Sequence, residues 1–183
     1  MRKALYVMGI LDDEDVEWLA SRGRRLGVGK DEVLIREGEP VDALFILLDG
    51  SLDVSTRGRA VATLFAGEIV GEISFVDARP PSATVRAAQF SHVLAIPRGL
   101  LQSRLATDAW FASRFFRAIA TFLADRLRTT TARLGYDGGG ADEREDEDEI
   151  DLDMMDSVSL AAVRFDKMLK RLQGDASSSR HSA

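Results

Sequence analysis

The chain contains no cysteine, and this absence removes several kinds of chemistry. Without thiols there is no disulfide framework, no iron–sulfur ligation and no thiol nucleophile. Histidine is scarce as well, because His92 and His181 are the only two in the sequence. A cupin-like barrel needs a cluster of histidines for its metal, so that class of protein is excluded. No nucleophile stands beside a base, and we expect a protein without catalytic or metal-ligating residues.

Long apolar runs are missing too. No stretch approaches the ~20 apolar residues that cross a bilayer, so we expect no membrane insertion. The start of the chain carries Arg2 and Lys3 before an apolar segment, but acidic residues 12–15 follow at once without a small-residue cleavage site. This pattern favours a cytoplasmic protein over a secreted one.

The charge is unevenly distributed. The formal net charge is −6, yet residues 141–156 alone hold ten acidic side chains and one basic side chain. The remainder of the chain is therefore slightly basic, which gives no electrostatic footprint for nucleic acid.

Short apolar and β-branched runs, separated by turn residues, fill the middle of the chain. Ahead of them, Asp12 or Asp13 can cap a helix that Gly23 or Gly27 ends. Such closely spaced strands predict an antiparallel barrel or jelly roll over residues 31–97. The runs are Val33–Arg36, Ala43–Leu48, Ser51–Ser55, Ala60–Phe65, Ala83–Ala87 and Val93–Ile96.

After Pro97 the apolar period becomes helical. It predicts a short helix over 98–107 and a longer one that Asp108 caps and that runs to Leu134. The apolar side chains of the longer helix cover about half its circumference, wider than the ~100° stripe needed to pack on one surface. Two interpretations stay open. Either the N-terminal helices cover the excess, or a second copy does, with Phe111 and Phe122 at the seam of a homodimer.

Three segments follow the domain predicted over residues 1–136. Gly-rich and acidic sequence over 137–156 predicts a disordered linker. Residues 157–173 show one apolar and one basic face, which predicts an amphipathic helix, and the serine-rich residues 174–183 predict a disordered tail. Because an isolated helix of this length is marginal in water, we expect it to dock on a protein partner through Phe165, Leu169 and Leu172.

The stretch from Gly71 to Val85 carries the clearest motif. It is a glycine-led turn, a segment that opens with Glu72, a Pro-Pro loop and a strand entered through Ser-Ala-Thr. Such a turn directs backbone N–H groups towards one point, where an anion can bind. The stretch resembles the phosphate-binding cassette of the cyclic-nucleotide-binding domain family, which reads Gly-Glu-[Leu/Ile]-[Ala/Ser/Gly]-[Leu/Phe] and then Pro-Arg-[Ala/Ser/Thr]-Ala-[Thr/Val].

Two more segments support this resemblance. Residues 33–39 are similar to the first strand and turn of the family, and residues 43–52 are similar to its hairpin, with Gly50 at the characteristic glycine. Together with the cassette, they extend the resemblance over residues 5–134. It implies a mainly β fold with flanking helices, an antiparallel β-roll of the catabolite-activator type.

The resemblance also implies roles for individual residues. Glu72 would accept a hydrogen bond from the ribose 2′-hydroxyl of cyclic AMP or cyclic GMP, or it would serve only as a helix-start carboxylate. The turn at Gly71, the backbone near Ile73, Ser74 and Ala83, and the Ser82 hydroxyl would face the cyclic phosphate. Further implied contacts with sugar and base come from Ile69, Val70 and Val85.

One residue departs from the family pattern. Pro81 occupies the position of the phosphate-pairing arginine. Losing one member of a buried charged pair costs ~2–5 kcal/mol, which weakens binding ~30-fold to ~3,000-fold. Arg79, two residues earlier, is the local candidate to replace that charge, and the alternative is an exposed loop arginine.

Two functions follow from these features, and the sequence leaves both open. In the first, the chain is a non-catalytic regulatory protein that senses a cyclic nucleotide or a related phosphate ligand. In the second, the site is degenerate, and the chain is an adaptor that recruits a protein through its C-terminal helix. Relatives that bind DNA place a helix-turn-helix after the long helix. The acidic sequence found there would repel phosphate, so we expect no direct DNA binding.

Overall fold

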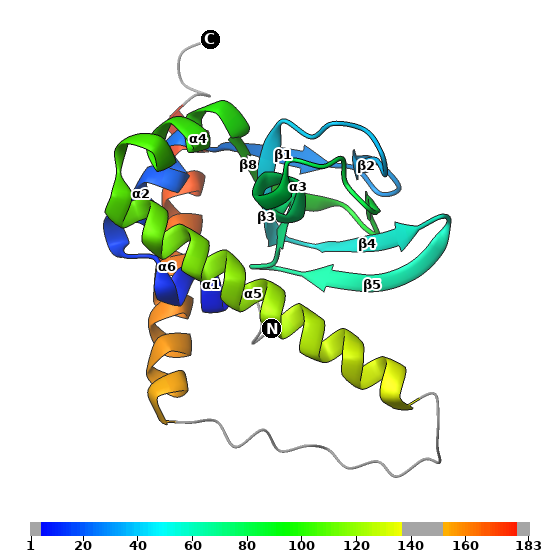
Figure 1. The fold of residues 1–183 in the computed structure, drawn as a ribbon. Helices are drawn as coiled ribbons and strands as arrows, with labels where there is room; N and C mark the ends of the chain where they lie inside the picture. Colours follow the sequence, from blue (N-terminus) through cyan, green and yellow to red (C-terminus); the bar gives the residue numbers. More distant parts are fainter. Residues whose placement is uncertain (1–4, 137–151, 179–183) are drawn as a thin grey trace.

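A β-roll with a layer of helices along one side forms the protein (Figure 1). The structure is a computed structural model, and it describes residues 5–136 and 152–178. The strands are β1 (Arg24–Val28), β2 (Val33–Ile35), β3 (Ala43–Asp49), β4 (Ser51–Thr56), β5 (Arg59–Phe65), β6 (Ile69–Val70), β7 (Thr84–Ala87) and β8 (Ser91–Pro97). The helices are α1 (Leu5–Ile10), α2 (Asp13–Arg22), α3 (Glu72–Asp77), α4 (Arg98–Thr107), α5 (Ala109–Tyr136) and α6 (Leu152–Ser178).

The strands form two four-stranded antiparallel sheets. One sheet has the order β1-β8-β3-β6 and the other the order β2-β7-β4-β5. The predicted fold class, an antiparallel β-roll with flanking helices, is therefore confirmed. Some paired strands are far apart in the sequence. In the pair β2 and β7, for example, Val33 lies opposite Arg86.

Strand β3 is buried on both faces, which explains its unbroken apolar run. Leu44 and Ile46 pack with the helices, whereas Phe45 and Leu47 pack between the two sheets. Because successive side chains of a strand point to opposite faces, one strand supplies residues to both cores. The neighbouring strand β8 alternates in the same way.

Capping side chains fix the helix starts, as the sequence predicts. Asp12 accepts a hydrogen bond from the backbone N–H of Asp15, whose side chain accepts from the backbone of Asp12 in return. This reciprocal capping box satisfies two N–H groups at the start of α2. Asp108 accepts from the N–H of Phe111 at 2.9 Å and caps α5.

Two strands were not predicted, and the β-roll begins at residue 24 instead of 31. Strand β1 lies at the edge of its sheet, and only its last residue, Val28, is buried. Its sequence therefore lacks the apolar signature on which strand prediction depends. Strand β6 has two residues, too few to show a period.

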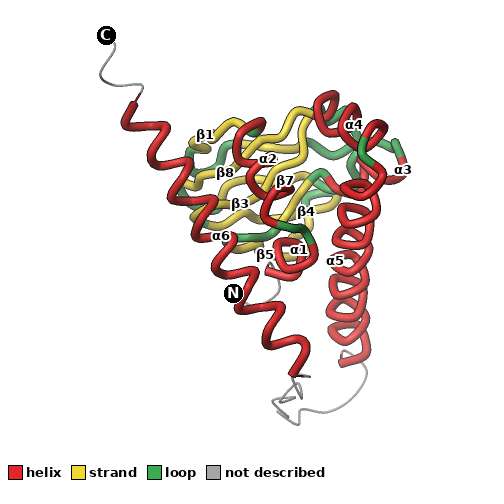
Figure 2. The backbone as a smooth tube through the Cα atoms, turned by 90° about the vertical axis from the view of Figure 1, so that its left-hand side faces the viewer, coloured by secondary structure: helices red, strands yellow, loops and turns green. Residues whose placement is uncertain are grey.

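Helix α6 packs on its own domain, which corrects the expectation that its apolar face serves a separate partner. Figure 2 shows it lying across α1 and α2. Phe165 and Leu169 pack against the helical core, and Leu172 is buried in it together with Ala161 and Met168. The helix is also longer than predicted at both ends. The predicted linker lies outside the described residues, except for its last five, which are helical.

Polar contacts hold α6 in the same place. The Arg164 guanidinium donates from Nε to Asp13 at 2.6 Å and from Nη1 to the carbonyl oxygens of Met8 and Gly9 at 3.2 Å. Arg171 pairs with Glu17 of α2. The hydrogen bond from Arg164 also lowers the pKa of the Asp13 carboxyl.

The structure also corrects the two phenylalanines expected at a dimer seam. Phe111 is 0 % exposed and Phe122 is 4 % exposed within the single chain. The N-terminal helices α1 and α2 pack on this face of α5, which is the alternative that the sequence left open. In the described part of the chain, no helix is long and apolar enough to cross a membrane.

Candidate functional site

The turn from β6 into α3 places a carboxylate inside the protein. Gly71 has φ 90°, a left-handed conformation, and a Cβ added there would lie 2.9 Å from the carbonyl oxygen of Ala43. Only glycine fits this position without strain or collision. The turn makes Glu72 the first residue of α3, where its side chain is only 2 % exposed.

The Glu72 carboxylate is paired with an arginine that reaches in from α5. The Arg126 Nη1 donates to Glu72 Oε1, and its Nη2 lies 3.5 Å from the carbonyl oxygen of Ile69. The guanidinium also stacks over the Phe122 ring, 4.7 Å from its centroid. Burial raises the pKa of the Glu72 carboxyl, and the Arg126 charge offsets only part of that rise. A buried carboxylate held at such a cost is typical of functional sites.

Two hollows lie beside Arg126, whereas buried Glu72 is not among the described residues that line either of them. A small one of about 60 Å³ is lined by the cassette, and a larger one of about 430 Å³ lies between the β4–β5 hairpin and the C-terminal half of α5. Arg126, Ile73, Ser82 and Ala83 line both hollows. A volume of several hundred Å³ is sufficient for a small organic ligand.

Most of the residues predicted for the site gather around the small hollow. Five of the seven predicted ligand-binding residues line it: Gly71, Ile73, Ser74, Ser82 and Ala83. Val70 and Val85 line it as well, as the resemblance implies. Ile69 does not, because its side chain is buried in the helical core and only its carbonyl oxygen faces Arg126.

Pro81 lies at the small hollow, whereas Arg79 does not. Pro81 lines the small hollow, and its carbonyl oxygen accepts from the N–H of Gly38 at 2.9 Å, which ties the loop to the turn after β2. Arg79 is exposed, and its backbone N–H donates to Asp77 Oδ1 at 3.0 Å. It is not among the described residues that line either hollow, so the structure supports the exposed-loop alternative for Arg79.

The larger hollow combines an apolar wall with polar groups. Val54, Val61 and Leu64 contribute the apolar surface from the hairpin, and α5 contributes Thr129 and Thr130. The Thr130 hydroxyl donates to the carbonyl oxygen of Arg126 at 2.8 Å. Such a surface suits a flat, partly apolar group that carries a few hydrogen-bonding atoms.

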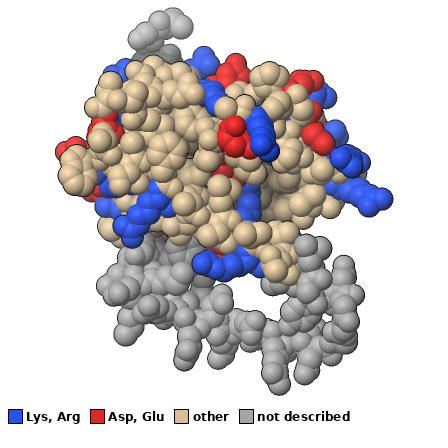
Figure 3. Space-filling view, viewed as in Figure 1, with Lys and Arg blue, Asp and Glu red and all other residues tan. Residues whose placement is uncertain are grey.

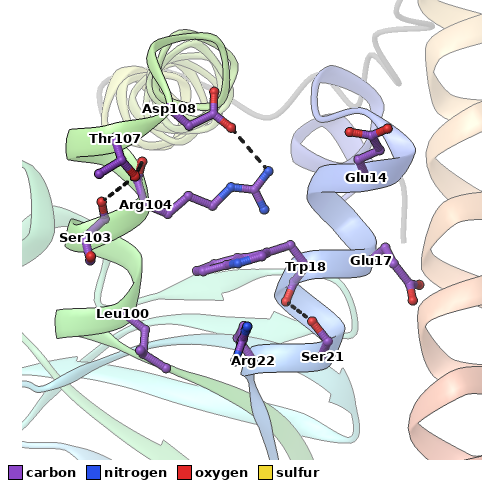
Figure 4. Close-up of a pocket in the computed structure, with 10 residues that line it drawn as sticks. All are labelled: Glu14, Glu17, Trp18, Ser21, Arg22, Leu100, Ser103, Arg104, Thr107 and Asp108. Carbon is purple, nitrogen blue, oxygen red and sulfur yellow. Dashed lines mark hydrogen bonds and ion pairs between the residues drawn. The ribbon is translucent and has the colours of Figure 1, made fainter.

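Another hollow, of about 780 Å³, lies between α2 and α4 (Figure 4). The charged side chains at its centre form ion pairs with one another. Arg104 stacks over Trp18 with its guanidinium 4.8 Å from the ring centroid, and pairs with Asp108 at 3.5 Å and with buried Asp15 at 3.1 Å. We therefore regard these residues as a structural ion-pair cluster. Among the described residues, no group of three His, Asp or Glu side chains is placed to hold a metal ion.

Sequence reasoning missed Arg126, which lies 54 positions after Glu72. In the sequence, Arg126 cannot be distinguished from a solvent-exposed arginine such as Arg128, two residues later. Only the packing of α5 against the roll distinguishes it. The face shown in Figure 3 bears basic side chains scattered among acidic ones.

Comparison with known proteins finds matches to the roll of this chain. Residues 26–108 match the family model described as "Cyclic nucleotide-binding domain". A crystal structure of a cyclic nucleotide-binding domain from Methylobacillus flagellatus superimposes with a TM-score of 0.67 at 24 % identity, over 76 % of this chain and 84 % of that one. The family model covers less than half of the chain, and the superposition shows the fold of a cyclic nucleotide-binding domain.

The curated relatives are much longer proteins. An uncharacterized NTE family protein of Mycobacterium tuberculosis is 28 % identical over 128 residues, which is 69 % of this chain and 22 % of that protein. A cGMP-dependent protein kinase of Toxoplasma gondii is 37 % identical over 68 residues, 37 % of this chain and 7 % of the kinase. The chain therefore spans less than a quarter of the length of these relatives.

Proposed function

We propose that the chain is a non-catalytic regulatory module whose β-roll binds a cyclic nucleotide, cyclic AMP or cyclic GMP, or a closely related phosphate ligand. The observation that carries this proposal is Arg126, which lines both hollows and is paired with the buried Glu72 carboxylate of the cassette. In a ligand complex this carboxylate would accept a hydrogen bond from the ribose hydroxyl. The cassette would surround the phosphate, and the base would lie in the larger hollow.

The expected affinity is modest because Pro81 supplies no charge. An arginine there would form a charge-assisted, often bidentate contact with phosphate. Pro81→Arg should therefore strengthen the binding of cyclic AMP or cyclic GMP by at least tenfold. Submicromolar binding by the natural chain would contradict the view that its cassette is weakened.

Isothermal titration calorimetry with cyclic AMP, cyclic GMP and cyclic dinucleotides tests the proposal directly. Glu72→Ala should abolish the heat of binding, because it removes the buried acceptor. Glu39→Ala removes an exposed carboxylate and is the matched control. Absence of binding by both the natural chain and the Pro81→Arg variant would refute ligand sensing and favour the adaptor alternative.

The proposal includes a homodimer, with a seam different from the one expected from sequence. Phe116, Ala120, Leu123 and Leu127 follow one another at spacings of four, three and four residues along α5, beside its buried face, and Leu123 also packs partly against the core. Phe116 is 46 % exposed and Leu127 is 67 % exposed. This spacing is that of a two-helix seam, and the small Ala120 would allow close approach.

The adaptor alternative rests on the outer face of α6. Leu160 and Val163 are exposed there, one turn apart. A protein partner could contact this pair while Phe165, Leu169 and Leu172 stay on the domain. Capture of a partner by the natural chain and not by a Leu160→Asp, Val163→Asp variant would support it, provided that cyclic nucleotides do not bind.

A further inference from the structure

The two hollows at the cassette have one source of positive charge. Among the described residues that line them, Arg126 is the single cation. Pro81 lines the small hollow and carries no charge. An anionic ligand in this space would therefore meet the guanidinium of a helix residue before any cation of the cassette loop.

Arg126 has donors to spare. A guanidinium carries five N–H donors in a planar fork. Within the described structure, it donates to Glu72 Oε1 and, at the long distance of 3.5 Å, to the carbonyl oxygen of Ile69. Its side chain is 32 % exposed, so it is neither sealed in the core nor fully hydrated. It can keep its hydrogen bond to Glu72 and donate to a second anion from its remaining N–H groups.

The fixed surroundings of Arg126 favour this second contact. The Phe122 ring under the guanidinium removes water from one side of it. Ser82 and Ala83, where the cassette enters β7, line the same space. Charge-assisted hydrogen bonds are stronger where water is excluded.

We infer that Arg126 supplies, from α5, the phosphate-binding charge that Pro81 cannot supply from the cassette, so that ligand binding and the position of α5 are coupled. This inference rests on the proposed cyclic-nucleotide function. A cation on the cassette loop would hold the ligand without the helix. A cation on α5 binds only when the helix lies against the roll, so the ligand stabilises that placement by its difference in affinity.

The test is a transfer of the charge, measured by calorimetry with cyclic AMP and cyclic GMP and, as a phosphate-free probe, adenosine. Arg126→Gln should weaken binding of the cyclic nucleotide about tenfold to a hundredfold and should weaken adenosine, which lacks the phosphate, much less. The double variant Arg126→Gln, Pro81→Arg should recover the affinity. Arg128→Gln on the same helix and Arg79→Ala on the loop are the controls, and each should bind like the natural chain.

Hydrogen exchange of the α5 amides gives the second readout. Ligand should protect the C-terminal half of α5 in the natural chain and should not do so in the double variant, although both bind. If Arg126→Gln keeps natural affinity, or if Arg79→Ala causes the loss instead, the inference is overturned and the proposed function survives. If neither the natural chain nor the Pro81→Arg variant binds a cyclic nucleotide, both fall together.

Discussion

Arg114 of α5 reaches Asp15 of α2 with its Nε 2.6 Å from Oδ2, and the Asp15 side chain has no exposed surface. Arg104 of α4 lies 3.1 Å from the other carboxylate oxygen. One carboxylate therefore joins three helices of the layer that packs on the roll. Burial by itself would raise the pKa of Asp15, but the hydrogen bond from Arg114 and the neighbouring positive charges outweigh it and lower the pKa.

Asp15→Asn is expected to lower the free energy of unfolding by about 3–5 kcal/mol at neutral pH, because it leaves two partly buried arginines without their counter-charge. Since the folded pKa is below the ordinary value, the stabilisation is present above pH ~4 and is lost as the pH falls through the folded pKa. Urea unfolding of both proteins between pH 3 and pH 7 measures this. Glu14→Gln, an exposed change on the same helix, is the control, and a difference that grows towards acid pH would contradict the sign.

Glu72→Gln is expected to raise the melting temperature of the ligand-free chain at pH 8 and to have little effect at pH 5. The folded pKa of Glu72 lies above its ordinary value because of burial. Stability from this group is then fully present below the ordinary pKa of ~4.3 and is lost as the pH rises through the folded pKa. Glutamine does not titrate and still accepts a hydrogen bond from Arg126. A melting temperature of the natural chain that rises relative to that of the variant as the pH increases would disprove this account.

Met168→Ala in α6 is expected to lower the free energy of unfolding by about 2–4 kcal/mol, because the side chain is 2 % exposed and its removal leaves a cavity. Val163→Ala, on the exposed side of the same helix, should change it by less than about 0.5 kcal/mol. Chemical denaturation of both variants gives the comparison. Equal stabilities would show that α6 leaves the domain in solution, as the sequence first suggested.

Phe116→Glu is expected to convert a homodimer into a monomer while the fold persists, because its side chain lies outside the core. A carboxylate on the seam would face its own copy and be desolvated there. Analytical ultracentrifugation from 1 to about 200 µM distinguishes the two states. Trp110→Glu, an exposed residue off the seam, should leave the dimer intact, and a natural chain that stays monomeric at the highest concentration would end the hypothesis.

The cassette could be predicted from sequence because its requirements are local. Gly71 must adopt a positive φ, and Glu72 must follow it directly, so both leave a mark in consecutive residues. The same holds for Asp12 and Asp108, whose capping role depends on amides three positions away.

Features that depend on distant packing left no such mark. Nothing near Arg126 in the sequence indicates that its guanidinium meets Glu72. The buried face of α5 looked wide enough for a second copy because α1 and α2, which pack on it, are far from it in sequence. For the same reason the sequence could not indicate which partner Phe165 contacts.

Because Leu44 and Phe45 point to opposite faces of β3, this strand belongs to both hydrophobic cores. The helical layer cannot lose its packing without loosening the backbone that the sheet-to-sheet core also uses. We therefore expect the fluorescence of Trp18 in the helical layer and the circular dichroism of the sheets to report one shared midpoint during denaturation. In such a molecule, a disturbance at the helices reaches the cassette side through the peptide backbone itself, without any chain of side chains to carry it.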